Sequence, residues 1–130
     1  MPRRKLLIAL AAACLSLPLA AHAATVATFS RAAFTQAQRE GRPILIHITA
    51  SWCPTCAAQR PILARLETLP QFRDLIVYNV DFDTRKDVVR AMGATMQSTL
   101  IAFHGEQETG RSVGDTDPHR IQALVDKTLG

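Results

Sequence analysis

The sequence of 130 residues is poor in aromatic side chains and in cysteine. Phe, Trp and Tyr together make up 5% of it, with one Trp and one Tyr, and it contains three Cys. No basic stretch is interleaved with aromatic residues that could stack on bases, so we expect no nucleic acid partner. Three cysteines also cannot build the disulfide framework of a small secreted scaffold. No internal repeat or low-complexity tract is visible.

The first 23 residues have the order of a secretory signal. Arg3, Arg4 and Lys5 precede an apolar run from Leu6 to Ala21, and Ala21-His22-Ala23 forms an A-x-A site. This order predicts cleavage after Ala23 and a mature domain of residues 24–130 in the periplasm, with no membrane attachment after cleavage. The apolar run is short for a membrane span, which needs about 20 apolar residues.

Two other interpretations of this segment are possible. It could be kept as an uncleaved anchor, or Cys14, which follows three alanines, could carry a lipid. The lipid is the weaker alternative, because the residues after Cys14 stay apolar and position 11 lacks the usual leucine.

Cleavage would change the charge of the protein. Residues 1–23 hold three of the fifteen Lys and Arg residues and none of the eleven acidic residues, so the formal net charge falls from +4 to +1. The basic character of the whole chain thus comes mostly from the signal. The remaining 107 residues can bury one core without structural disulfides, which predicts a single domain and a monomer.

The order of apolar and turn residues after residue 24 predicts alternating helices and strands. We expect a helix from Ser30, its N-cap, to Gly41, a strand over residues 43–49, a helix from Cys53 to about residue 69, a strand over 76–81 and a short helix capped by Asp83 or Thr84. Strands over 99–103 and 111–113 follow. A last helix is capped by Thr116 or Asp117 and has Pro118 at its first position, with residues 121, 124, 125 and 129 on its apolar face. A βαβ unit followed by a hairpin and a terminal helix predicts an α/β sandwich with a central mixed sheet.

The two cysteines of the mature chain are Cys53 and Cys56, at the junction of a strand and a helix. Backbone N–H groups at a helix N-terminus stabilise a thiolate, so we expect a lowered pKa and a nucleophilic role for Cys53. Cys56, within disulfide reach, would resolve a mixed disulfide. Alternatives are an inert clip, although so short a loop gains little stability, and half of a metal site, although no further cysteine remains.

The segment Ala50-Ser51-Trp52-Cys53-Pro54-Thr55-Cys56 resembles the active-site segment of the thioredoxin family. Pro61 falls where the helix of that family has a kink proline, and residues 78–81, Gly93, residues 99–103 and Gly114 also match in spacing. The resemblance covers nearly all of the mature chain. It implies a thioredoxin-like fold, thiol–disulfide exchange on protein substrates without a cofactor or metal, and a second thiol protein as electron donor or acceptor.

The resemblance also implies a substrate-contacting surface around the cysteine pair. Trp52 and Pro54 would border the pair on one side, and the loop of Gln97, Ser98 and Thr99 would face it. In this loop Ser98 stands where the family has a cis-proline. A cis bond before serine would cost about 3–4 kcal/mol, so we expect a trans bond and a reshaped loop. The Ser98 hydroxyl could donate to the Cys53 thiolate, or it could only fill space.

His47 is a second departure from the family pattern. It lies six residues before Cys53, where thioredoxins often carry a buried acidic residue. A neutral imidazole there could accept the proton of Cys56 during resolution, or it could be a structural histidine of the strand.

Two functions compete on this sequence. The first is a thiol–disulfide oxidoreductase that acts as a reductant, because Pro54-Thr55 offers no charge to stabilise the thiolate strongly. The second is a non-catalytic module that binds Cu(I) through the dithiol, for which no methionine-rich or histidine-rich tract supplies further ligands.

Overall fold

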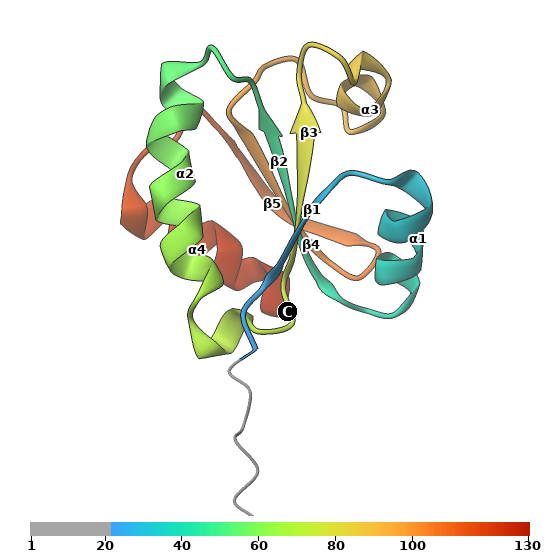
Figure 1. Ribbon diagram of the computed structural model, residues 1–130. Helices are drawn as coiled ribbons and strands as arrows, with labels where there is room; N and C mark the ends of the chain where they lie inside the picture. The colour runs from blue at the N-terminus through green and yellow to red at the C-terminus, as the bar shows by residue number, and fades with distance from the viewer. Residues whose placement is uncertain (1–21) are drawn as a thin grey trace, which may run out of the picture.

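A computed structural model describes residues 22–130 of the chain (Figure 1). A single five-stranded sheet has the order β1-β3-β2-β4-β5. β1, β3 and β2 run parallel, β4 is antiparallel to β2, and β5 is antiparallel to β4. The strands are β1 (Thr25–Thr28), β2 (Pro43–Thr49), β3 (Ile76–Asp81), β4 (Thr99–His104) and β5 (Gln107–Val113).

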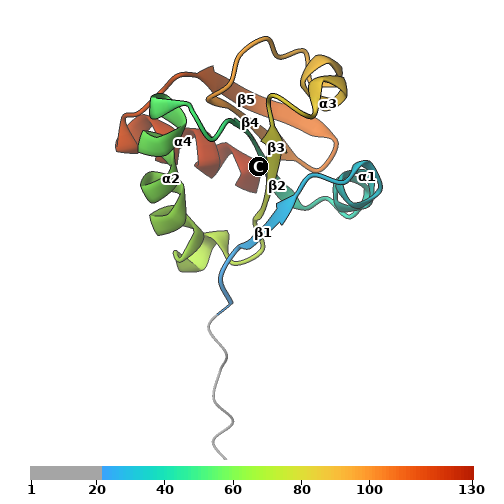
Figure 2. The ribbon, with the colours of Figure 1, turned by 45° about the horizontal axis from the view of Figure 1, so that its top comes forward.

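Helices cover both faces of this sheet, which makes the predicted α/β sandwich (Figures 1 and 2). α2 and α4 lie on one face, and α1 and α3 lie on the other. The helices are α1 (Arg31–Arg39), α2 (Pro54–Glu67), α3 (Lys86–Ala91) and α4 (Pro118–Asp126), with short 3-10 turns η1 (Pro70–Phe72) and η2 (Lys127–Leu129).

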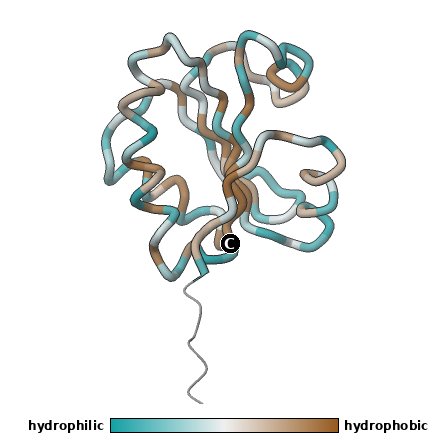
Figure 3. Tube along the Cα trace, viewed as in Figure 1, coloured by the Kyte–Doolittle hydropathy of each residue, from teal (hydrophilic) through white to brown (hydrophobic). Residues whose placement is uncertain are grey.

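The central strand β2 shows how the sheet separates two cores. Ile44, Ile46 and Ile48 point into the cluster beneath α1 and α3, whereas Leu45 points into the cluster beneath α2 and α4. Successive side chains of a strand face opposite sides, so His47 lies on the α2 and α4 face. Hydrophobic residues follow the central strands through the middle of the molecule (Figure 3).

Caps at the helix starts agree with the sequence in two of three cases. The Ser30 hydroxyl accepts the N–H of Ala33 at 3.4 Å, and the Asp117 carboxylate accepts the N–H of Arg120 at 2.9 Å. Each satisfies a backbone donor that the first helical turn leaves open. The third prediction was wrong, because α3 begins after Arg85 and has no side-chain cap.

The residues predicted to cap α3 lie instead in a turn that precedes the helix. The Asp81 carboxylate, at the end of β3, accepts the N–H groups of both Asp83 and Thr84 at 2.9 Å. This turn continues the chain beyond the sheet before α3 can start. The same hydrogen bonds, with that of the Thr84 backbone as the main cause, lower the pKa of Asp81.

Other differences from the expected elements lie at the edges of the fold. β1 was not expected, and β5 is longer than the three residues predicted for it. α4 ends at Asp126, and Leu129 lies in η2 with 41% of its surface exposed, so its predicted place on the apolar face was wrong. Edge strands of four residues with mostly exposed side chains carry little periodic signal.

The predicted signal lies almost entirely outside the described residues, which begin at His22. Within residues 22–130, no helix has the length and apolar character to cross a bilayer. The first backbone contact of the domain is made by Ala24, whose N–H donates to the Glu67 carbonyl at 3.0 Å.

Candidate active site

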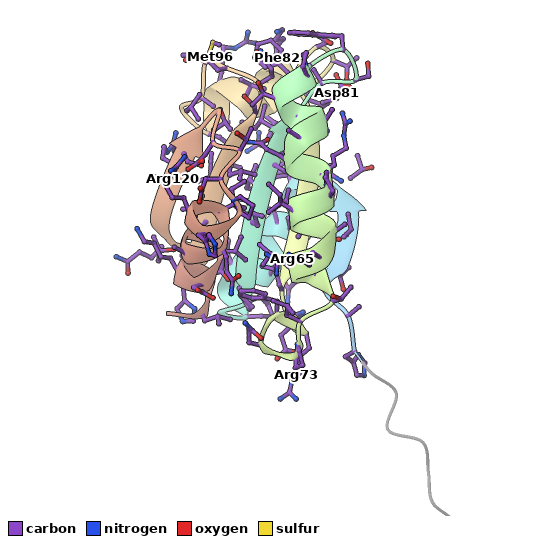
Figure 4. All side chains as sticks on the ribbon, turned by 90° about the vertical axis from the view of Figure 1, so that its left-hand side faces the viewer. Arg65, Arg73, Asp81, Phe82, Met96 and Arg120 are labelled. Atoms are coloured by element: carbon purple, nitrogen blue, oxygen red, sulfur yellow. The ribbon has the colours of Figure 1, made fainter. Side chains whose placement is uncertain are left out.

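The cysteine pair lies at one end of the sheet, where the chain leaves β2 and enters α2 (Figure 1). Met96, Phe82 and Asp81 gather at this same end, opposite Arg65 and Arg73 (Figure 4). The carboxyl ends of the parallel strands β2 and β3 meet there, so loops from distant parts of the chain surround the start of α2.

Cys53 is the N-cap residue of α2. Its backbone is extended (φ −84°, ψ 114°), and its Sγ accepts the N–H of Cys56 at 3.1 Å. Pro54 at the first helical position has no N–H and fixes φ near the helical value. Both cysteines are free thiols, of which Cys53 keeps 3% of its surface exposed and Cys56 none. Cys53 is therefore the sulfur that a substrate can reach.

The pKa of each thiol depends on the other thiol. Burial and the hydrogen bond with Cys56 raise the pKa of Cys53, against the lowering effect of the Cys56 N–H. Burial also raises the pKa of Cys56, but hydrogen bonds from the Cys53 thiol, the Ala50 and Ser98 backbone and the Thr49 hydroxyl outweigh it and leave this pKa lowered. These opposite directions arise because the two thiols interact, so the lowering expected for Cys53 alone becomes a property of the pair.

This arrangement still makes Cys53 the attacking thiol. Of the two sulfurs, only that of Cys53 belongs to a residue with exposed surface, so Cys53 is the thiol that can meet a substrate disulfide. The first ionisation therefore belongs to the pair, and substrate access selects the sulfur that reacts.

Trp52 and Phe82 border the pair differently. Trp52 is 57% exposed, and its Nε1–H donates to the Asp83 carboxylate at 2.7 Å, which fixes the indole at the surface. Phe82 packs against the small cluster of Ala50, Cys53 and Cys56. Pro54 is exposed beside them, as expected for a residue at a substrate-contacting surface.

The Gln97-Ser98 bond is trans, as predicted, because the described residues contain no cis peptide bond. Ser98 adopts φ 57°, the left-handed region that few residues other than glycine occupy. Its hydroxyl donates to the Gln97 carbonyl at 2.6 Å, so the alternative in which it donates to the Cys53 thiolate was wrong. The donor that Ser98 gives to a sulfur is its backbone N–H, directed at Cys56.

The neighbours of Ser98 also differ in exposure. Gln97 is half-buried, whereas Thr99 is 1% exposed and its hydroxyl donates to the Met96 carbonyl at 2.7 Å. The Thr99 side chain thus fixes the loop from within, and its predicted place on the substrate-contacting surface was wrong. Met96, which is 48% exposed, is the residue of this loop whose side chain lies at the surface in place of Thr99.

His47 is buried, with 3% of its surface exposed, and its Nε2 lies 3.2 Å from Gln59 Oε1. Burial lowers its pKa, hydrogen bonds with Gln59 and Asn79 oppose this, and the charge of Arg60 lowers the pKa further. Neither hydrogen-bond partner is a sulfur. These contacts agree with the alternative of a structural histidine, and the acceptance of the Cys56 proton by His47 stays a prediction.

Sequence reasoning missed Gln59 and Thr49. Gln59 lies one helical turn after Cys56 and is fully buried, on the same face of α2 as Leu63 and Leu66. A polar residue on this otherwise apolar face was the available signal. The Thr49 hydroxyl is buried and makes no hydrogen bond of ordinary geometry with the described residues, but it lies close enough to Cys56 to contribute to the lowered pKa of that thiol.

Metal ligands are scarce around the pair. Among residues 22–130, no group of three or more His, Cys, Asp or Glu side chains could hold a metal ion.

Known proteins resemble this chain over most of its length. The family model described as Thioredoxin matches residues 25–127. A thioredoxin of Mycobacterium tuberculosis is 30% identical over 91 residues, which cover 70% of this chain and 78% of that protein. A thioredoxin of Aspergillus fumigatus is 28% identical over 93 residues, 71% of this chain and 84% of that protein.

Solved structures give the same result. The crystal structure of Trxlp from Edwardsiella tarda has a TM-score of 0.76 and 42% sequence identity, covering 78% of this chain and 98% of that one. Malassezia sympodialis thioredoxin shares the fold, with a TM-score of 0.71 at 23% identity, 82% of this chain and 95% of that one.

The fold, the reduced cysteine pair at the start of α2 and these matches define a thiol–disulfide oxidoreductase of the thioredoxin type. The chain belongs to the thioredoxin family.

Proposed function

We propose that this protein acts in the periplasm as a reductant of protein disulfides and is itself reduced again by a second thiol protein. One observation carries the proposal. The reduced pair is held at the start of α2 with the Cys53 sulfur 3.1 Å from the Cys56 N–H, beside a Trp52 side chain that is 57% exposed. A protein disulfide can approach Cys53 across this surface.

The exchange proceeds in two displacements. The Cys53 thiolate attacks one sulfur of the substrate disulfide, which forms a mixed disulfide and releases the first substrate thiolate. The Cys56 thiolate then attacks the Cys53 sulfur, which forms the Cys53–Cys56 disulfide and releases the second substrate thiolate. Two electrons pass from the dithiol to the substrate. Donors from Thr49 and the Ser98 backbone stabilise the Cys56 thiolate before it attacks.

Export is supported by the order of the first residues and by where the domain begins. Basic, apolar and A-x-A segments follow one another up to Ala23. Ala24 makes the first backbone hydrogen bond, and β1 begins at Thr25. Removal of residues 1–23 would leave every described helix and strand whole.

The absence of charge in the two residues between the cysteines supports the proposed direction of electron flow. Pro54 and Thr55 carry no charge, and a change of 30 mV in the potential of a dithiol corresponds to about 1.4 kcal/mol of thiolate stabilisation. Without a cation in the motif, we expect a potential more negative than about −180 mV, the value of protein disulfide isomerase. A reductant in an oxidising compartment needs a thiol protein as electron donor.

Fractionation and a reduction assay test this proposal. Envelope fractions should contain a protein whose intact mass corresponds to residues 24–130, and this protein should reduce insulin when a dithiol donor is present, whereas Cys53→Ser should not. Retention of residues 1–23 would instead indicate an anchor. Tight stoichiometric Cu(I) binding by a dithiol that fails to reduce insulin would indicate the metal-binding module.

A further inference from the structure

The Gln59 side chain joins three parts of the active site that are distant in the sequence. Its Nε2 donates to the Ser98 carbonyl at 3.1 Å and to the Asp115 carbonyl at 2.9 Å, and its Oε1 lies 3.2 Å from His47 Nε2. Gln59 itself is fully buried on α2. A buried polar side chain on an apolar helix face carries a desolvation cost that only satisfied hydrogen bonds offset.

The two carbonyls fix the orientation of this amide. A carbonyl oxygen only accepts, so the atom that faces Ser98 and Asp115 must be the NH2 group with its two protons. Oε1 then faces His47 as an acceptor, which requires the His47 proton on Nε2. His47 therefore cannot take up a proton at Nε2, and the Gln59 amide uses both of its donors on the two loops.

These bonds hold a loop that needs support. Ser98 has φ 57°, and such a conformation persists in a residue with a Cβ only where the surroundings fix it. The Ser98 carbonyl is held twice, by the Gln59 amide and by the N–H of Gly114 at 3.0 Å. On its other side, the Ser98 backbone N–H is one of the groups that lower the pKa of Cys56.

We propose that Gln59 is a positioning residue, which holds the Ser98 loop and the turn at Asp115 against α2 and so places the Ser98 N–H at the Cys56 sulfur. Gln59 touches no sulfur and acts through the loop. The inference depends on the exchange chemistry of the pair and not on the compartment or the direction of electron flow. Titration of the thiols therefore tests it even where the proposed periplasmic role fails.

The first test replaces Gln59 by Leu, which has a similar volume and no donors. Loss of the anchor should let the Ser98 N–H move from Cys56, so the pKa of the first thiol ionisation should rise by about half a unit to one unit. Below this pKa, alkylation by iodoacetamide should slow by about three- to tenfold. Thiolate absorbance and alkylation rates of the full mature protein measure both effects.

Leu63→Ala is the matched control. Leu63 lies on the same face of α2, one turn beyond Gln59, and packs in the core below α2 and α4, where its apolar side chain has no hydrogen bond to lose. It should lower stability and leave the thiol titration where it is in the wild type. If Gln59→Leu lowers stability but has the same thiol titration curve as Leu63→Ala, Gln59 only fills space and the proposal is overturned.

Gln59→Glu provides a second variant should Gln59→Leu fail to fold. An ionised carboxylate can accept from His47 but cannot donate to the two carbonyls. It should therefore raise the pKa of His47 and raise the thiol pKa as Gln59→Leu does. Nitrogen chemical shifts of the imidazole complete the test: wild-type His47 should carry its proton on Nε2, and a proton on Nδ1 would refute the assigned network.

Discussion

The Ser98 hydroxyl donates to the Gln97 carbonyl at 2.6 Å, and this bond uses the one proton that the hydroxyl could have offered to a sulfur. At the position where the family has proline, the side chain of this protein thus stabilises its own loop. Contact with the redox centre is left to the Ser98 backbone N–H, a donor that proline lacks.

Ser98→Ala should therefore leave the thiol titration almost unchanged. The variant keeps the backbone N–H and loses a local hydrogen bond, so stability should fall by about 0.5–1.5 kcal/mol. Denaturant unfolding and thiolate absorbance measure the two quantities. A rise of the thiol pKa by more than a few tenths of a unit would mean that the hydroxyl does reach a sulfur.

Ser98→Pro should change both the thiol titration and the stability. Proline fixes φ near −65°, which is incompatible with the observed φ of 57°, and it removes the N–H directed at Cys56. We expect the thiol pKa to rise and stability to fall by about 1–3 kcal/mol. Equal stability and titration in Ser98→Pro and wild type would contradict this account of the loop.

Thr49→Val tests the contribution of the Thr49 hydroxyl to the lowered pKa of Cys56. Valine has nearly the shape of threonine but no hydroxyl, and the buried Thr49 hydroxyl makes no other hydrogen bond that would be lost. Removal of this donor should raise the thiol pKa by about half a unit and change stability by less than about 1 kcal/mol. Thr84→Val, at a surface site beyond β3, is the control and should leave the titration unaltered.

The variants Cys56→Ser and Cys53→Ser should differ in whether they trap a mixed disulfide with a substrate. Because Cys53 is the more exposed sulfur, Cys56→Ser should accumulate a mixed disulfide with a protein substrate, whereas Cys53→Ser should form none. Non-reducing electrophoresis and peptide mass mapping identify the adduct. Equal alkylation of the two thiols in the wild-type dithiol would contradict the assignment.

The sequence predicted the elements that carry a strong local signal. β2 and β3 have the predicted bounds, since both are apolar runs closed by polar residues. β1 was missed because its four side chains are mostly exposed on an edge. The fold class followed from the order of these elements, which local patterns determine.

The active site could be predicted only in part, for a physical reason. Cys53 and Cys56 belong to one short motif, so their proximity can be read from spacing. The roles of His47 and Ser98 depend on which groups lie across from them, and those groups come from α2 and from the turn at Asp115. Hydrogen-bond direction inside such a network is set by tertiary contacts that no periodicity records.

The last prediction concerns the pH dependence of stability, which follows from the buried His47. Burial lowers its pKa in the folded protein below the ordinary value of 6.5. Between the lowered pKa and 6.5 the unfolded chain binds more protons than the folded one, so stability rises with pH in this window. The contribution of neutral His47 is complete above 6.5 and is lost as pH falls, with a slope of at most about 1.4 kcal/mol per pH unit.

Urea unfolding between about pH 7.5 and 5 measures this slope, because carboxylates titrate mostly at lower pH. His47→Gln should flatten the curve, and His119→Gln, at an exposed position, should keep the wild-type slope. A slope that survives in His47→Gln would assign the titration to another group.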